Sequence, residues 1–306
     1  MHLKMAARSL VIYFIKEEIL MNPHELDLVL TFIQSHPDAA ARELELQRPE
    51  TATELILALP KKQAHRVLMH MLPSCAARLC NQIPVDRAAE LLVDGNVNQV
   101  AAILRCLQKP RCNKVLKGLP EKTATLCRLV LSYSEDTIGA WMVADIVMLP
   151  ADCTAADALK RLALSNSSAD SNKVPVIDKQ QYVIGLVDVR DLLRAKAETV
   201  VTALVRETPS VLSSRTSVTA AARDKAWHHH DTLLVLNRNR QLIGLLRHVD
   251  LRRSLARFSE VSGATSQNDF LGSIGEGYVG SLSAMLGLFH VQQPASMTSI
   301  SLGEKS

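Results

Sequence analysis

The sequence predicts a multidomain fold in which an all-α, right-handed solenoid-like superhelix is followed by a tandem pair of α/β modules. Prolines recur about every dozen residues in the first half. In the second half a strand–turn–strand–helix pattern returns after a shift of 59 residues. No run of about eighteen uncharged apolar residues occurs, so we expect no segment that spans a bilayer. The 306 residues are also more than one ordinary hydrophobic core requires.

Composition excludes few classes of protein but favours helices. Ala and Leu supply most of the apolar surface, and only 4% of the residues are aromatic. The net charge of +4 is too small to indicate a nucleic-acid binder. Because no CxxC pair is present, we interpret the cysteines as reduced core thiols of a cytosolic protein rather than as redox or zinc sites.

Residues 1–23 are expected to be an N-terminal extension. Their apolar run, residues 9–15, is too short to cross a membrane, and no small-residue cleavage pattern follows it. A cytoplasmic location is therefore expected. Met21 is an alternative start, since Asn22-Pro23 resembles a fresh helix cap.

Residues 24–131 are predicted to form the helical array. Pro37, Pro49, Pro60, Pro73 and Pro84 are separated by 12, 11, 13 and 11 residues, with Ala/Leu-rich stretches between them. Proline is favoured in the first turn of a helix and excluded from its interior, so this spacing predicts helices of about two turns. Such helices must stack on neighbours, in pairs of about 24 residues. The period looks less clean past Pro84, and an irregular helical bundle is the alternative.

The second half contains two copies of one unit. Residues 174–178 and 183–187 read as strand, turn and strand, followed by a helix, and residues 233–237 and 242–246 repeat the pattern. Upstream, each copy has a strand and a capped amphipathic helix, predicted over residues 154–164 and 216–227. Each unit of about sixty residues is therefore a β-α-β-β-α module.

These modules resemble a CBS-domain pair. The junction at residues 131–137, Leu-Ser-Tyr-Ser-Glu-Asp-Thr, resembles the linker of the MgtE magnesium-transporter family, and the proline-punctuated array resembles that family's N-terminal domain. The resemblance covers residues 24–257 and lacks the family's transmembrane pore. It implies an MgtE-type helical domain at 24–131, CBS modules at 132–198 and 199–258, and a homodimer through the CBS pair. Residues 259–306 are left as a linker and an amphipathic tail.

The resemblance implies that carboxylates of this region hold Mg²⁺ between domains. Oxygen ligands and retained waters suit that ion. The candidate ligands in this sequence are scattered, and the family's acidic run after the second module is replaced by the arginine-rich residues 252–257. Ion pairs are therefore an alternative to metal in holding the domains together. The candidates are Glu90, Asp94, Asp136, Asp145 and Asp178, with Asp188 and Asp250 beside them.

CBS pairs also bind adenosine nucleotides such as ATP or AMP between their modules. The family pattern is Gly, two spacers, Ser or Thr, two spacers, and Asp. Here it reads Gly185, Asp188 and Asp191 in the first module, and Gly244, Arg247 and Asp250 in the second. Asp191 and Asp250 suit ribose hydroxyls, Asp188 would repel a phosphate, and Arg247 would attract one. Alternatively, the aspartates only cap helices.

Two further features have plain interpretations. The run His228-His229-His230-Asp231 is expected to be a polar loop, because consecutive side chains do not face one metal ion. Residues 270–291 have apolar residues at helical spacing and are predicted to dock on the same chain or a dimer mate. Contact with another protein or a membrane surface is the alternative.

No catalytic constellation is recognisable, so an enzyme is not expected. The sequence predicts a regulatory or sensor protein resembling the cytosolic part of a magnesium transporter, with Mg²⁺ or a nucleotide as ligand. Two alternatives stand beside it: a protein-interaction scaffold whose ligand sites have decayed, and an accessory component of magnesium transport.

Overall fold

The computed structural model describes residues 23–165, 172–206 and 208–263. The chain forms two compact units, residues 1–254 and 255–306, and the fold below belongs to the first. No helix in the described ranges is long and apolar enough to cross a membrane. The predicted N-terminal extension and the predicted helix at 270–291 lie outside the described residues.

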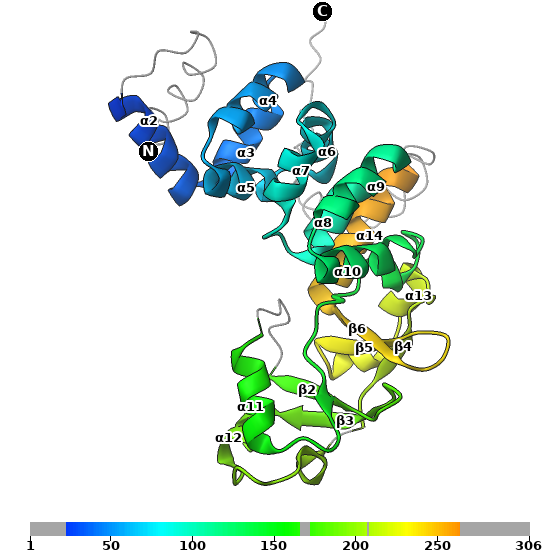
Figure 1. The fold of residues 1–306 in the computed structure, drawn as a ribbon. Helices are drawn as coiled ribbons and strands as arrows, with labels where there is room; N and C mark the ends of the chain where they lie inside the picture. Colours follow the sequence, from blue (N-terminus) through cyan, green and yellow to red (C-terminus); the bar gives the residue numbers. More distant parts are fainter. Residues whose placement is uncertain (1–22, 166–171, 207, 264–306) are drawn as a thin grey trace, which may run out of the picture. The chain divides into compact units, whose positions relative to one another are not determined.

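The first half of the described chain is a series of short helices (Figure 1). Proline occupies the first helical position of α3, α4 and α6, where its missing amide costs no hydrogen bond. The helices are α2 (Pro23–Ser35), α3 (Pro37–Glu45), α4 (Pro49–Ala58), α5 (Lys61–His70), α6 (Pro73–Gln82), α7 (Val85–Leu92), α8 (Val97–Arg105), α9 (Lys109–Gly118) and α10 (Glu121–Leu131).

From α3 to α10, every helix begins 12 residues after the one before it. Alternate helices contact each other, α3 with α5, α7 and α9 in turn, and α4 with α6, α8 and α10 in turn. Two layers of stacked helices result, with a structural repeat of 24 residues, as the proline spacing predicts. The expectation that the period weakens past Pro84 is wrong for the helix starts. There, other caps replace proline, such as Asn96, whose side chain accepts from the Asn98 amide.

The core of the array repeats with the same period. The fourth residue of successive odd-numbered helices is small, and the eighth is a buried leucine that fills the space between the layers. The four leucines are Leu44, Leu68, Leu92 and Leu116. Arg111 of α9 adds a polar link, since its guanidinium donates to the carbonyls of Cys80 and Ile83 at the end of α6.

The second half contains two three-stranded sheets of identical topology. In module 1, β1 (Leu149–Pro150) pairs parallel with β2 (Lys173–Ile177), which pairs antiparallel with β3 (Val183–Asp188). In module 2, β4 (Val211–Ser213), β5 (Thr232–Leu236) and β6 (Leu242–Arg247) repeat this order. Both hairpins have a register shift at the same place, Val176/Ile177 and Val235/Leu236. The predicted duplication is therefore present in three dimensions.

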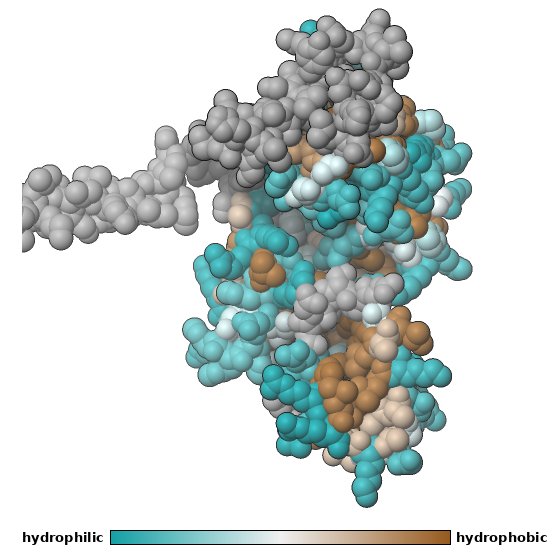
Figure 2. Space-filling model, turned by 90° about the vertical axis from the view of Figure 1, so that its left-hand side faces the viewer, coloured by the Kyte–Doolittle hydropathy of each residue, from teal (hydrophilic) through white to brown (hydrophobic). Residues whose placement is uncertain are grey.

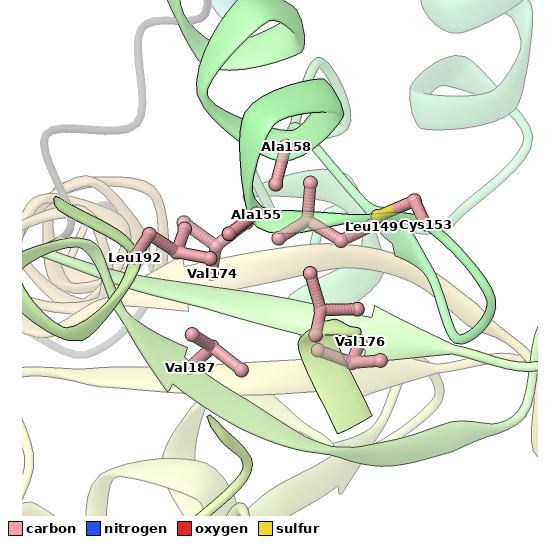
Figure 3. Close-up of a cluster of buried hydrophobic side chains, with 9 residues drawn as sticks. Leu149, Cys153, Ala155, Ala158, Val174, Val176, Val187 and Leu192 are labelled. Atoms are coloured by element: carbon pink, nitrogen blue, oxygen red, sulfur yellow. The ribbon is translucent and has the colours of Figure 1, made fainter. Parts of the chain in front are cut away.

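Helices cover one face of each sheet. In module 1, α11 (Ala155–Ala163) and α12 (Val189–Arg194) pack on Val174, Val176 and Val187 of the sheet, as Figure 3 shows. In module 2 the helices are α13 (Val218–Ala222) and α14 (His248–Gly263). The predicted helix over residues 216–227 is shorter than expected. It stops because Asp224 caps a separate 3-10 turn, η3 (Lys225–His228), by accepting from the Ala226 amide.

The two hairpin turns are also copies of each other. Asp178 Oδ1 accepts from the amides of Gln180 and Tyr182, and Asn237 Oδ1 accepts from the amides of Asn239 and Gln241. Each turn also contains one non-glycine residue in the left-handed region. These are Gln181, with φ 68°, and Arg240, with φ 60°.

Candidate ligand sites of the α/β pair

The two modules pack against each other through the sheet faces that their helices leave open. Leu234, Leu242 and Leu245 of module 2 form a buried cluster with Ile177 and Val183 of module 1 against it. A hydrogen bond from the Leu242 amide to the Gln181 carbonyl joins the two hairpin turns at 3.0 Å. The pair is therefore one packed body, and the sequence positions predicted for a nucleotide lie at the β3–α12 and β6–α14 junctions.

In module 1 both aspartates of the pattern already have partners. Asp188 caps α12, because its Oδ1 accepts from the Arg190 amide at 2.8 Å. Asp191 lies one turn further along and forms an ion pair with Arg206, 3.1 Å between Oδ2 and Nε. The Arg206 side chain is 74% exposed, so this pair is worth little in free energy and is easily exchanged for another partner.

In module 2 the pattern residues bind each other more firmly. Arg247 approaches Asp250 with two nitrogens, Nε at 2.5 Å from Oδ2 and Nη2 at 3.1 Å from Oδ1. Arg253 adds a third contact at 3.5 Å, and the Asp250 side chain is only 11% exposed. Such a bidentate, largely buried pair costs far more to break than an exposed one. Asp250 is therefore poorly placed to turn towards a ribose.

Gly244 has a structural role that the pattern alone does not reveal. A Cβ on this residue would lie 2.7 Å from the backbone oxygen of Val143 and 3.1 Å from the Met142 sulfur. Glycine is therefore required here by the close approach of another strand of the chain. Gly185, its counterpart in module 1, is a buried residue of β3.

The carboxylates predicted to bind Mg²⁺ are not brought together. Within the described ranges, no three His, Cys, Asp or Glu side chains are placed to hold one metal ion. Glu90 pairs with Arg87 at 2.7 Å, and these cationic neighbours lower the pKa of its carboxyl. Asp145 pairs with Lys122, and Asp178 is used by its own turn. Asp94 and Asp136 are exposed, on the turn after α7 and after α10 respectively. The histidine run follows η3 and contributes to no metal group among these residues.

The feature that sequence reasoning missed is the path of residues 132–148, which we call the connecting segment. It leaves α10 and first binds module 2. The amides of Ile138 and Gly139 donate to the carbonyls of Thr216 and Ser214, and Val143 and Leu245 exchange two backbone hydrogen bonds of 2.7 and 3.0 Å. The chain then continues into β1 of module 1. One segment therefore links the helical array to both modules.

The connecting segment also contacts the last helices of the array. Arg105 of α8 lies 3.4 Å from the carboxylate of Glu135 and donates to the Val130 carbonyl at 3.1 Å. Lys122 of α10 lies 2.8 Å from Asp145. Asn98 Nδ2 donates to the Trp141 carbonyl at 3.2 Å. Nothing in the linear pattern marks Arg105 or Lys122, since both look like ordinary surface cations of amphipathic helices.

Comparison with known proteins agrees with this arrangement. Residues 35–136 match the family model of the MgtE intracellular N domain, and residues 138–198 match that of the CBS domain. No curated protein matches the sequence. The fold is similar to a structure of "the cytosolic domain of the Mg2+ channel MgtE in complex with ATP", at 21% identity, with 74% of this chain and 94% of that chain covered and a TM-score of 0.64. It is also similar to "the soluble part of a magnesium transporter", at 18% identity, with 76% and 97% covered and a TM-score of 0.54.

Proposed function

Because residues 35–136 belong to the MgtE intracellular N-domain family and are followed by a CBS pair, we propose that this chain is a non-enzymatic regulatory module of a magnesium-transport system. A ligand of the CBS pair would change how the two modules pack and thereby shift the helical array. The observation that carries the proposal is the connecting segment. It is hydrogen-bonded into module 2, supplies the edge strand of module 1, and ends at α10. A movement between the modules must therefore pull on the array.

The ligand that we propose is an adenosine nucleotide bound at Asp191. The first of the similar structures contains ATP, and the two modules of this chain differ in how readily their aspartates are released. Asp191 is held by one exposed arginine, whereas Asp250 is held by Arg247 and Arg253. When ribose hydroxyls replace Arg206 at Asp191, the guanidinium becomes available to a phosphate. The carboxylate of Asp188 opposes the phosphate charge, so we expect weak binding, in the micromolar to millimolar range.

Calorimetric titration of the purified chain with ATP tests this assignment. We expect wild-type protein and the Asp250→Asn variant to bind, and Asp191→Ala to lose binding. Loss in Asp250→Asn but not in Asp191→Ala would move the site to module 2, and silence of the wild type would refute the nucleotide. Mg²⁺ alone is titrated in parallel, since the family relation also suggests that ion. An isotherm without nucleotide would support magnesium sensing.

The exposed apolar surface of module 1 supports a homodimer formed through the CBS pair. Figure 2 shows hydrophobic residues gathered on this part of the surface, and Leu164 and Leu193 are 77% and 67% exposed. Unpartnered surface of this kind often marks an interface. Sedimentation of Leu193→Glu should show a shift towards monomer. Leu46→Glu, at a residue 73% exposed on the helical array, should leave the association unchanged.

The alternative of a protein scaffold is supported by the charge of α9. Lys109, Lys114 and Lys117 are all exposed on this helix, which contains no acidic residue. If the ligand sites have decayed, neither ATP nor Mg²⁺ gives heat, and an acidic partner bound by wild type is released by the Lys114→Glu/Lys117→Glu variant. An accessory role in transport requires instead that a membrane transporter co-purifies with the tagged chain.

A further inference from the structure

The contact between the connecting segment and the helical array is charge-complementary. Two cations of the array, Arg105 on α8 and Lys122 on α10, meet two carboxylates of the segment, Glu135 and Asp145. Arg105 is the better held of the two cations, because its side chain is 20% exposed and its guanidinium also donates to the Val130 carbonyl. Lys122 is 75% exposed, but its ammonium lies 2.8 Å from an Asp145 side chain that is only 29% exposed.

This arrangement leaves little for a divalent cation to do at the contact. Mg²⁺ needs several oxygen ligands in near-octahedral geometry, and it favours places where carboxylates would otherwise repel one another. Here each carboxylate of the contact already faces a positive side chain. No second carboxylate is grouped with Asp145 or Glu135 into a metal-binding cluster within the described residues. The Lys122 ammonium occupies the position beside Asp145 that a bridging cation would take.

We propose that ion pairs, and not a bound divalent cation, hold the connecting segment on the helical array, with Lys122 in the place of a metal ion. The contact then responds to ionic strength and is indifferent to millimolar Mg²⁺. This inference concerns how the array and the segment are joined. It therefore stands or falls independently of whether a nucleotide binds at Asp191.

The sharpest test is Lys122→Glu, which replaces the ammonium by a carboxylate that faces Asp145. The variant should lose the ion pair and gain a pair of like charges, which is an arrangement that Mg²⁺ can bridge. The matched control is Lys62→Glu. Lys62 is also the second residue of its helix, follows proline in the same way, and is exposed. The two substitutions therefore share their effect on the helix dipole and on net charge.

Hydrogen–deuterium exchange of peptides covering residues 133–146 is the readout. In wild-type protein, exchange should rise about two- to fivefold between low and high NaCl, because screening weakens the exposed pairs, and should not differ between EDTA and millimolar Mg²⁺. In Lys122→Glu, exchange in EDTA should be about two- to tenfold faster than in wild type and should slow when Mg²⁺ is added. Lys62→Glu should behave as wild type.

Two outcomes would overturn the proposal. One is a wild-type segment whose exchange slows on addition of Mg²⁺, which would show a metal at this contact. The other is a Lys122→Glu variant whose exchange in EDTA equals that of wild type and of Lys62→Glu, which would show that the ion pair does not hold the segment. The same comparison at low and high NaCl separates loss of the pair from a general loss of folding, since a misfolded variant exchanges quickly throughout the chain.

Discussion

Replacing Gly244 by alanine should detach the connecting segment from module 2. The added Cβ would lie 2.7 Å from the Val143 oxygen, well inside van der Waals contact, and the obstructing atom is backbone. The same oxygen accepts from the Leu245 amide at 3.0 Å, and the Val143 amide donates to the Leu245 oxygen at 2.7 Å. Relief of the clash therefore requires the two strands to separate, which stretches both hydrogen bonds.

The magnitude follows from these two effects. Forcing one methyl group into a packed interior costs about 1–3 kcal/mol, and each weakened hydrogen bond adds up to about 1 kcal/mol. We expect a loss of about 2–3 kcal/mol in the free energy that holds the segment. Since about 1.4 kcal/mol is a factor of ten, the amides of Val143 and Leu245 should exchange roughly 30- to 100-fold faster.

Hydrogen exchange and denaturant unfolding of Gly244→Ala, with and without Met142→Ala, provide the assay. Because the nearest obstacle is a backbone atom, trimming Met142 should not rescue the alanine variant, and the cost of Gly244→Ala should persist in the Met142→Ala background. Full rescue by Met142→Ala, or unchanged exchange at Val143, would refute this account of the close approach.

Three further predictions concern stability. Burial raises the pKa of Cys80 and of Cys127 to about 12 from an ordinary 9.0, so both thiols bind protons more tightly in the folded protein, and the free energy of unfolding should fall as pH rises from about 9 towards 12. Alanine at either position should flatten that slope in alkaline denaturation curves, and an unchanged slope would count against burial as the cause. Asn237→Ala removes the acceptor for two turn amides and should lower the midpoint of urea unfolding by an amount equivalent to about 1–2 kcal/mol; no change would show that the turn forms without its cap. Leu68→Ala, at a residue with no exposed surface, should cost about 2–5 kcal/mol in the same assay, whereas Leu46→Ala on the surface should cost under about 0.5 kcal/mol.

Sequence reasoning captured the helical array because its signal is local. Proline excludes itself from helix interiors, so Pro37, Pro49 and Pro73 mark helix starts without any knowledge of tertiary contacts. The regularity of the starts at Val85, Val97 and Lys109 could not be seen in that way, because no proline stands at those positions. Tertiary packing of the repeat preserves the period there, and the sequence records it only as buried apolar residues.

The module pair was predictable for a similar reason, whereas the site was not. A repeat of strand, turn and strand is visible in the alternation of residue types, and the turn caps Asp178 and Asn237 recur in register. The partners of Asp191 and Asp145 are Arg206 and Lys122, at 15 and 23 residues' distance. Which cation meets which carboxylate depends on how helices and segments pack, and exposed cations carry no sequence signature of their partner.

The regulatory proposal depends most directly on whether ligand binding at the module pair reaches the connecting segment. The decisive measurement is hydrogen exchange of residues 133–146 in the full chain, with and without saturating ATP, in wild type and Asp191→Ala. We predict that ATP changes the exchange of the Val143 amide and its neighbours in wild type and leaves it unchanged in Asp191→Ala. Binding of ATP, established by calorimetry, that leaves exchange across the whole segment untouched would contradict the account.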